Sequence, residues 1–365
     1  MKRRRIDYLR NRFRPICRTA SLLITCLLAF ICVALFPQTL RAQQLSIGIS
    51  SDASARAITI TAAGRPFATF MYPDNLPKPV LYPIYAPDGQ LITRGFPLKP
   101  RSGEPVDHPH HIGLWFNYEN VNGLDFWNNS YAIPAAKRSQ YGWIHTEMTQ
   151  VKGSALEYTA RWTDQQGHPL LLELTGYRFR ANDSERIIDR ITTLTALVDT
   201  GVSFPDAKDG MLGLRVTKEL QIPSNTPGEF IDDKGNITKV AAGNTPDING
   251  NYLTSEGKTG DSAWGTRGRW CEMYGKKLNK VLSVVIIDHP DNPGYPTYWH
   301  ARGYGLFAAN PLGQKVFSNG RQTLNFHLAR GQSVNFRYRI VIASGNAPLS
   351  TGRIGQLADD FARMK

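Results

Sequence analysis

Cysteine is scarce in this sequence and unevenly placed. Only four cysteines occur among 365 residues, and three of them fall within the first 32 positions. The remaining thiol, Cys271, stands between Trp270 and Glu272 in a strand-like run, which favours a buried structural thiol over a nucleophile. Residues 43–365 can therefore form no internal disulfide, and their stability must come from a hydrophobic core.

The first 42 residues have the order of a targeting segment. A long basic head rich in arginine precedes an uncharged, mostly apolar stretch from Ala20 to Phe36, and Leu40-Arg41-Ala42 ends in the small residue that signal peptidases prefer. This order predicts a signal peptide over residues 1–42 and a periplasmic or extracellular protein with no stable membrane insertion after cleavage. A signal anchor is the alternative, since 17 apolar-leaning residues are at the short limit for a membrane span.

Clustered positive charge is missing after this leader. The formal net charge of +13 comes mostly from the leader, which holds nine of the 43 Lys and Arg and one of the 30 Asp and Glu. Residues 43–365 keep 34 basic and 29 acidic residues, a net charge of about +5. Phosphate backbones are bound by grouped Lys and Arg, so the sequence excludes nucleic acid as a partner.

Helical periodicity is nearly missing as well. Only Thr351 to Met364 has helical spacing, which places Ile354, Leu357 and Phe361 on one face. Without a second helix of comparable length, an alternating βαβ fold is excluded. The sequence therefore predicts an all-β protein with antiparallel sheets and a short C-terminal helix.

Short apolar runs separated by Gly, Pro and Asp predict many strands. The clearest are 155–163, 170–179 and 186–198, which we expect to be three consecutive antiparallel strands. The other expected strands are 57–72, 81–85, 142–148, 281–288, 323–328 and 333–343. Ala329-Arg330-Gly331-Gln332 predicts a hairpin between the last two, with glycine near its tip.

This number of strands predicts one domain over residues 43–365, a large antiparallel β-sandwich of two stacked sheets. The polar, Gly- and Asn-rich stretch from Pro223 to Asp261 is the longest loop-like region. Loops of this length in a compact domain usually bind ligands or cover sites, so we expect this one to lie near the functional site.

Histidine is sparse, yet three of the eight fall within four positions, in Asp107-His108-Pro109-His110-His111. The aromatic-rich run Val121 to Trp127 follows closely. Imidazole is suited to proton transfer near neutral pH and to binding transition metals. Because Pro109 is unfavourable inside a central strand, we expect the segment to bend so that the three rings converge. Histidines that only cap a turn are the alternative.

Four further segments carry residue types that could complete such a site. Segment 208–216 places a lysine, an acid and an arginine around glycines, and segment 264–270 adds tryptophans. Asp288-His289-Pro290 repeats the Asp-His-Pro triplet at the end of an apolar strand, and segment 298–307 mixes aromatic rings with a histidine and an arginine. Strand ends and the loops beyond them are where sites assemble on β scaffolds.

Roles follow from these residue types. Acid–base catalysis is predicted for His110, His111 and His289. The residues predicted to bind substrate, through guanidinium forks, polar groups and stacking rings, are Asp107, Trp127, Lys208, Arg215, Trp299, Arg302 and Tyr304. One divalent metal, with His108 and His300 among its ligands, is the open alternative, although no fixed ligand spacing marks it.

In this order the segments resemble an uncharacterised family of exported bacterial proteins often labelled "methane oxygenase PmoA". The motifs that carry the resemblance are Leu81-Tyr82-Pro83-Ile84, Thr93-Arg94-Gly95-Phe96-Pro97, 107–113, 121–127, 208–216, Trp264-Gly265, Asp288-His289-Pro290 and 299–312. A membrane methane monooxygenase subunit needs several transmembrane helices, whereas this chain has one cleavable hydrophobic stretch. We therefore interpret the label as a misnomer.

The resemblance implies a fold similar to the galactose-mutarotase-like β-supersandwich and a role beside sugar-processing proteins. The histidine pair and late Glu base of true mutarotases are not found in their usual arrangement, so a shared fold would not fix the chemistry. We expect an exported carbohydrate-active enzyme, namely a hydrolase, lyase or epimerase that acts on a small sugar or keto-sugar. A non-catalytic carbohydrate-binding module is the alternative, and an oxygenase, as in the label, is more remote. The density of titratable groups favours catalysis.

Overall fold

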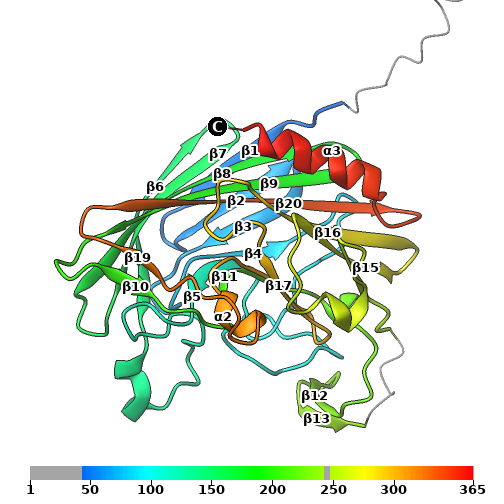
Figure 1. Cartoon of the computed structure of the whole chain (residues 1–365). Helices are drawn as coiled ribbons and strands as arrows, with labels where there is room; N and C mark the ends of the chain where they lie inside the picture. Colours follow the sequence, from blue (N-terminus) through cyan, green and yellow to red (C-terminus); the bar gives the residue numbers. More distant parts are fainter. Residues whose placement is uncertain (1–42, 242–246, 365) are drawn as a thin grey trace, which may run out of the picture. The chain divides into compact units, whose positions relative to one another are not determined.

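Two large sheets dominate the computed structural model, which describes residues 43–241 and 247–364 (Figure 1). The signal peptide predicted over residues 1–42 lies outside the described residues. Each large sheet has eight strands, and every pairing between neighbouring strands is antiparallel. The predicted all-β, antiparallel class is confirmed.

The strands of the first sheet are, in spatial order, β1 (Ile47–Asp52), β2 (Ala57–Ala62), β3 (Arg65–Met71), β4 (Val80–Ile84), β5 (Leu114–Tyr118), β11 (Gly210–Arg215), β18 (Leu306–Asn310) and β17 (Tyr298–Arg302). Those of the second sheet are β14 (Asn251–Thr254), β15 (Trp270–Lys277), β16 (Lys280–Asp288), β20 (Ser333–Gly345), β9 (Glu185–Ala196), β8 (Pro169–Ala181), β7 (Ala155–Thr163) and β6 (Trp143–Lys152). Two small ribbons pair β10 (Val202–Phe204) with β19 (Phe326–Leu328) and β12 (Gly228–Ile231) with β13 (Ile237–Val240). The helical elements are η1 (Ala135–Gln140), η2 (Lys218–Leu220), η3 (Gly260–Ala263), α2 (Gln314–Phe317) and α3 (Thr351–Ala362).

The main core lies between the two sheets. Along β8, alternate side chains are buried, as expected for a strand with one face in a core. Aromatic rings from the two sheets meet there: Phe70 stacks on Tyr158 with ring centres 4.9 Å apart, and Phe116 contacts Phe336 at 5.5 Å. These contacts confirm the predicted sandwich, in which two apolar faces cover each other.

The predicted C-terminal helix is α3, and it covers the outer face of the second sheet (Figure 1). Its apolar stripe packs on β9, β16 and β20 through Ile354, Leu357 and Phe361, while the Ser350 hydroxyl caps its N-terminus by accepting from the Arg353 amide. This helix is too short to span a bilayer, and none of the described helices has the length and hydrophobicity to do so.

The hairpin predicted around residues 329–332 is wrong. The backbone does turn there, because the Gln332 amide donates to the Ala329 carbonyl. However, β19 then pairs with β10, whereas β20 pairs with β16 and β9. The Gly331 amide also donates to the Ala196 carbonyl, so the turn is tied to the end of β9. A tight turn alone therefore does not decide strand pairing.

Two other stretches are more structured than the sequence suggests. Residues 57–72 form the hairpin β2–β3, whose turn residues Ala63 and Gly64 both have positive φ. The loop-like stretch 223–261 contains the hairpin β12–β13 and strand β14. Its polar composition suits a hairpin that projects from the sheets and so buries little of its surface.

A charged pair is sealed inside the sandwich core. Arg190 on β9 lies 2.7 Å from Glu173 on β8, and both side chains are almost fully buried. Glu173 also accepts hydrogen bonds from the Tyr158 hydroxyl at 2.6 Å and from the Trp162 indole at 2.7 Å. The Arg190 guanidinium lies 4.5 Å from the centre of the Phe116 ring on the opposite sheet. The hydrogen bonds and the ring thus compensate both buried charges.

We predict that Glu173→Ala lowers the free energy of unfolding by about 3–5 kcal/mol, because it leaves the Arg190 charge buried and unpaired. The measurement is urea denaturation followed by tryptophan fluorescence. The double variant Glu173→Leu/Arg190→Met should recover most of the loss, since it removes both charges. A single variant within about 1 kcal/mol of the parent protein would contradict this account.

Candidate functional site

The histidine cluster lies on the face of the first sheet that points away from the second sheet. One row of directly paired residues crosses this face: Trp115 on β5, Gly213 on β11, Ala308 on β18 and His300 on β17. The two small residues in the middle of the row leave room above the sheet. Trp115 fills part of this space, since a side chain at Gly213 would meet its ring at 2.5 Å.

Arg94, which is 1% exposed, holds the segment 107–111 in its bent shape. Its guanidinium donates to the backbone carbonyls of Asp107 at 2.7 Å, His108 at 3.0 Å and His111 at 3.2 Å. The His111 amide closes the turn by donating to the His108 carbonyl at 3.0 Å. His108 takes a φ of +47° as a result, a conformation rare for non-glycine residues outside tight turns. The predicted bend at Pro109 is confirmed.

The Asp107 carboxylate joins two arginines to one histidine. Its Oδ1 accepts from Arg94 at 2.7 Å and from Arg215 at 2.5 Å, and its Oδ2 accepts from Nδ1 of His108 at 2.5 Å. Burial alone would raise the pKa of Asp107, but the hydrogen bond from His108 and the charges of Arg215 and Arg94 hold it well below its usual range. Asp107 is therefore an ionised acceptor at every physiological pH.

The three histidine rings converge, as the sequence predicts. His108 stacks on His111 with ring centres 4.8 Å apart and on Tyr304 at 5.0 Å, and His110 meets His111 edge-on at 4.2 Å. His111 in turn stacks on Trp115 at 5.3 Å. The cluster thus continues as a stack of rings from the protein interior to its surface.

Of the three clustered histidines, only His108 combines exposure with an oriented ring. Its side chain is 41% exposed, Nδ1 donates to the ionised Asp107, and Nε2 makes no hydrogen bond with the described residues. His111 is 2% exposed, and burial keeps its pKa well below the usual value. Burial and the charge of Lys78 lower the pKa of His110 to about 2. The catalytic role predicted for His111 is therefore replaced by support of the ring stack, and His110 is a neutral imidazole.

A buried amine lies under the cluster. Lys78 is 1% exposed, its Nζ donates to the Trp127 carbonyl at 3.0 Å, and it lies 5.3 Å from the centre of the Trp115 ring. Burial lowers the pKa of Lys78 to about 7, against the opposing charge of Asp125. Lys78 is thus a site component that the sequence motifs did not reveal.

A pocket of about 600 Å³ opens beside His108. Asp107 and Tyr304, which both contact His108, form one wall. Arg302 and Asp261 lie on another side, and the polar segment 221–230 closes the rest, so the predicted loop does line the pocket. This volume falls within the usual range for small-molecule sites.

The hairpin β12–β13 is tied to the strand-like segment that leads into Asp107. The Gly103 amide donates to the Ile231 carbonyl at 2.7 Å, and the Val106 amide donates to the Glu229 carbonyl at 3.1 Å. Glu229 also lines the pocket. One wall of the pocket is therefore continuous, through backbone hydrogen bonds, with the residue that orients His108.

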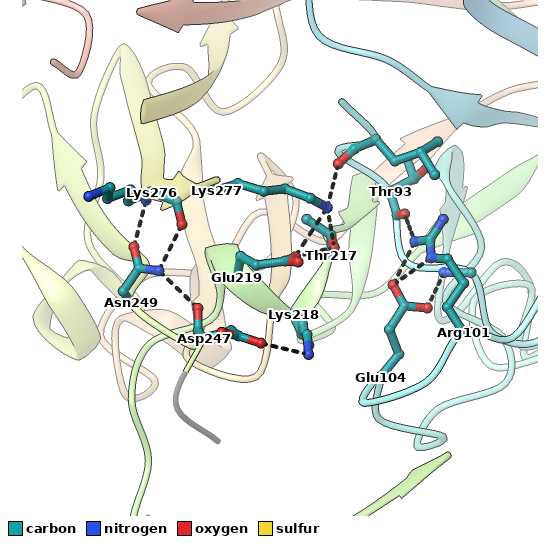
Figure 2. A network of polar contacts seen from close by, with 12 residues as sticks. Thr93, Arg101, Glu104, Thr217, Lys218, Glu219, Asp247, Asn249, Lys276 and Lys277 are labelled. Atoms are coloured by element: carbon teal, nitrogen blue, oxygen red, sulfur yellow. Dashed lines mark hydrogen bonds and ion pairs between the residues drawn. The ribbon is translucent and has the colours of Figure 1, made fainter. Parts of the chain in front are cut away.

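Figure 2 shows a network of polar contacts whose labelled residues do not themselves line this pocket. Lys277 on β15 lies 3.2 Å from Glu219 and donates to the Thr217 hydroxyl at 3.1 Å, and Arg101 forms an ion pair with Glu104 at 2.5 Å. These cations all have carboxylate partners. We therefore assign this network to fixing the segments on both sides of the pocket rather than to ligand binding.

Other residues predicted to bind substrate are not available to it. Trp299 is fully buried in the core between the sheets, and Trp127 is fully buried beneath His111. Arg215 is 0% exposed, and its guanidinium is used by Asp107. These predictions are corrected. Trp299, Trp127 and Arg215 lie beneath the surface of the site and support it by packing or by an ion pair. Arg302 and Tyr304, by contrast, line the pocket, and their binding of a substrate stays a prediction.

His289 belongs to a different part of the molecule. Its Nδ1 accepts from the Asp291 amide at 3.1 Å, and its Nε2 lies 3.2 Å from the Met364 carbonyl, behind α3. Its ring packs edge-on against Phe361 at 5.0 Å. Both ring nitrogens are used and the side chain is buried, so the predicted catalytic role is replaced by anchoring of the C-terminal segment.

Asp209 and His300 form a second acid–histidine pair, at 3.1 Å, which is almost fully buried. Burial lowers the pKa of His300, partly offset by Asp209. Lys208 lies 3.2 Å from Asp209 with its side chain 44% exposed, and it is outside the residues that line the pocket. The predicted metal ligands His108 and His300 thus have separate carboxylate partners. Among residues 43–241 and 247–364, no three His, Cys, Asp or Glu side chains are grouped as a metal site.

Arg94 and Asp209 are the central charged residues that sequence reasoning missed as site components. Arg94 lies in the motif Thr93 to Pro97, 13 positions before Asp107, and its side chain is buried. A lone arginine between a threonine and a glycine gives no periodic or compositional signal. Asp209 stands between two residues of interest, Lys208 and Gly210, and its closeness to His300 follows only from the pairing of β11, β18 and β17.

With this geometry in place, a comparison with protein families gives one match, a family model that covers residues 57–359. The chain belongs to the family of unknown function DUF6807. This agrees with the uncharacterised family expected from the motifs. The matched range of DUF6807 includes Arg94, the histidine cluster and Arg302. No curated relative matches the sequence.

Solved structures similar to this DUF6807 protein include two of mutarotase type. One is a galactose mutarotase-like protein from Clostridium acetobutylicum, with a TM-score of 0.36 and 11% identity over 83% of this chain and 99% of that chain. The other is a galactose mutarotase related enzyme from Lactobacillus acidophilus, with a TM-score of 0.31 and 8% identity over 83% of this chain and 99% of that chain.

We predict that Arg94→Met lowers the free energy of unfolding by about 3–5 kcal/mol, because the Asp107 carboxylate and the carbonyls of the bent segment lose their buried donor. The stability of Arg94→Lys should fall between those of the parent protein and Arg94→Met, because lysine keeps the positive charge but lacks the planar set of guanidinium donors. Guanidinium denaturation measures the effect, with Arg330→Met, an exposed arginine, as the control. Equal losses for the two methionine variants would show that Arg94 holds nothing in place.

We also predict that the stability of the protein rises between about pH 7 and pH 10 because of Lys78. Its pKa is about 7 when folded, against 10.5 as the reference value, so in this range the unfolded chain binds more protons and deprotonation favours the folded state. The gain is up to about 1.4 kcal/mol per pH unit. Lys78→Met should show a flatter curve in denaturation series at several pH values, whereas the exposed Lys280→Met should follow the parent protein. Parallel curves for all three would disprove the buried amine's role.

Proposed function

We propose that this protein is a carbohydrate-active enzyme that transfers a proton at a carbon of a sugar or keto-sugar, as lyases and epimerases do. The observation that carries the proposal is the Asp107–His108 pair beside the pocket: Asp107 lines it, and His108 contacts the lining residues Asp107 and Tyr304. An ionised carboxylate that accepts from Nδ1 fixes the tautomer of the ring and leaves Nε2 as a base. The predicted leader supports action outside the cytoplasm.

The composition of the pocket supports a polyhydroxylated ligand. Gln221, Asn225 and Asp261 offer donors and acceptors, and Tyr304 and Phe230 add aromatic surface. Sugars are bound by such combinations because their hydroxyls need planar polar partners, while their C–H faces stack on rings.

Hydrolysis of a glycosidic bond is supported less well by the same geometry. Most glycosidases use two carboxyl groups, one of which must carry a proton at the working pH. Asp107 is unsuited to that role, because Arg94, Arg215 and His108 keep it ionised. Proton transfer by His108, with the neighbouring Tyr304 phenol as a proton donor, needs no protonated carboxyl group. Burial raises the pKa of Tyr304 to about 12, so the phenol keeps its proton.

The test is exchange of carbon-bound protons in D₂O, followed by NMR with a panel of aldoses, sugar acids and keto-glycosides. We expect the parent protein to exchange or eliminate at least one substrate, and His108→Gln to lose roughly 100-fold or more of this rate. His168→Gln is the matched control, because His168 is also an exposed histidine paired with an aspartate, Asp164, at 2.9 Å.

Folding of each variant is checked by its melting temperature. If sugars raise the melting temperature of the parent protein without turnover, and His108→Gln behaves the same, the protein is a binding module and not an enzyme. An exchange rate that is equal in the parent protein and in a folded His108→Gln variant would also reject the proposed base.

A further inference from the structure

The pocket contains one guanidinium without an acidic partner. Arg302, at the end of β17, is the single Lys or Arg among the described residues that line the pocket, and it forms no ion pair with another described residue. Its guanidinium carbon lies 4.9 Å from the centre of the Trp264 ring. Stacking on an indole fixes the plane of a guanidinium and leaves its edge donors for a ligand.

The acids around Arg302 do not neutralise it. Asp107 is engaged with Arg94, Arg215 and His108, and it forms no ion pair with Arg302. Asp261 and Glu229 also line the pocket, but neither lies within ion-pair distance of the guanidinium. Carboxylates accept hydrogen bonds from sugar hydroxyls, so these two acids suit the neutral part of a sugar. The donor fork of Arg302 suits a planar anion.

Proton removal from a sugar carbon needs an adjacent group that accepts the electron pair. A carbonyl does this directly, whereas a carboxylate resists a second negative charge unless a cation lies next to it. Asp107 and Arg302 line the same pocket, and His108, the proposed base, contacts the lining residues Asp107 and Tyr304. The pocket therefore has the two components that a carboxylate-bearing substrate requires.

We propose that the substrate is a sugar acid, a uronate residue, whose carboxylate binds Arg302 while His108 removes the proton from the neighbouring carbon. This rests on the proposed function and names its substrate class. The C–H bond breaks, its proton goes to Nε2 of His108, and the electron pair moves into the carboxylate as an enediolate. Delivery of a proton from solvent water to the other face gives the epimer, and His108 then releases its proton to solvent. Alternatively, the electron pair returns, the bond to the oxygen on the next carbon breaks, and that oxygen leaves with a proton from Tyr304, which forms a carbon–carbon double bond.

The experiment compares three classes of probe with the full protein: methyl glucuronide and methyl galacturonide, their neutral methyl glycosides, and a methyl 3-keto-glucoside. Exchange in D₂O and formation of the double bond are followed by NMR and ultraviolet absorbance. We expect reaction at the carbon next to the carboxylate of a uronide, a loss of roughly 100-fold in Arg302→Gln, and partial recovery in Arg302→Lys. Arg330→Gln, which removes an exposed arginine on the 329–332 turn, should keep the parent rate.

The outcomes separate this inference from the function on which it rests. Reaction of the keto-glucoside alone, dependent on His108 and unchanged in Arg302→Gln, would overturn the sugar acid and keep the proton-transfer enzyme. No carbon-bound exchange with any probe would overturn both. The ratio of uronide to keto-glucoside rates in the parent protein decides between them even if Arg302→Gln fails to fold.

Discussion

The candidate site depends on one buried guanidinium, that of Arg94. A segment with Asp-His-Pro-His-His would be expected to run as an irregular loop, since it offers no apolar alternation to hold it on a sheet. Arg94 supplies the donors that its carbonyls need, and the Asp107 carboxylate supplies the charge that Arg94 needs. Each therefore removes the desolvation penalty of the other. The orientation of the exposed His108 ring follows from these contacts, because Asp107 accepts from its Nδ1.

Much of the fold could be predicted from the sequence because the signal is local. Strands with one face in the core alternate, as 155–163 shows by matching β7 in full, and the helical stripe ending at Phe361 has no competing interpretation. Pairing partners are a different matter, since β19 joins β10 across more than 120 positions. The residue pattern within β10 or β19 does not indicate this pairing, which depends on how the two large sheets are arranged.

The site was partly predictable for the same reason. The convergence of three histidines follows from their spacing and from one proline, and both are visible in the sequence. The depth of each side chain is not visible: Trp127, Trp299 and Arg215 share segments with pocket residues but lie behind them. His289 shows the limit most clearly, because the same triplet Asp-His-Pro that builds the site at Asp107 anchors a helix at Asp288. A motif of three residues fixes chemistry only together with the partners that surround it.

The hairpin β12–β13 contributes to the pocket wall but not to the groups that orient His108. It is joined to the body through the backbone of residues 103–106 and carries pocket residues, yet none of the side chains that orient His108 comes from it. The exposed turn at its tip, residues 232–236, can change in length or composition without disturbing the two arginines behind Asp107. A hairpin of another length would thus change the size of the pocket and leave the groups that orient His108 unchanged.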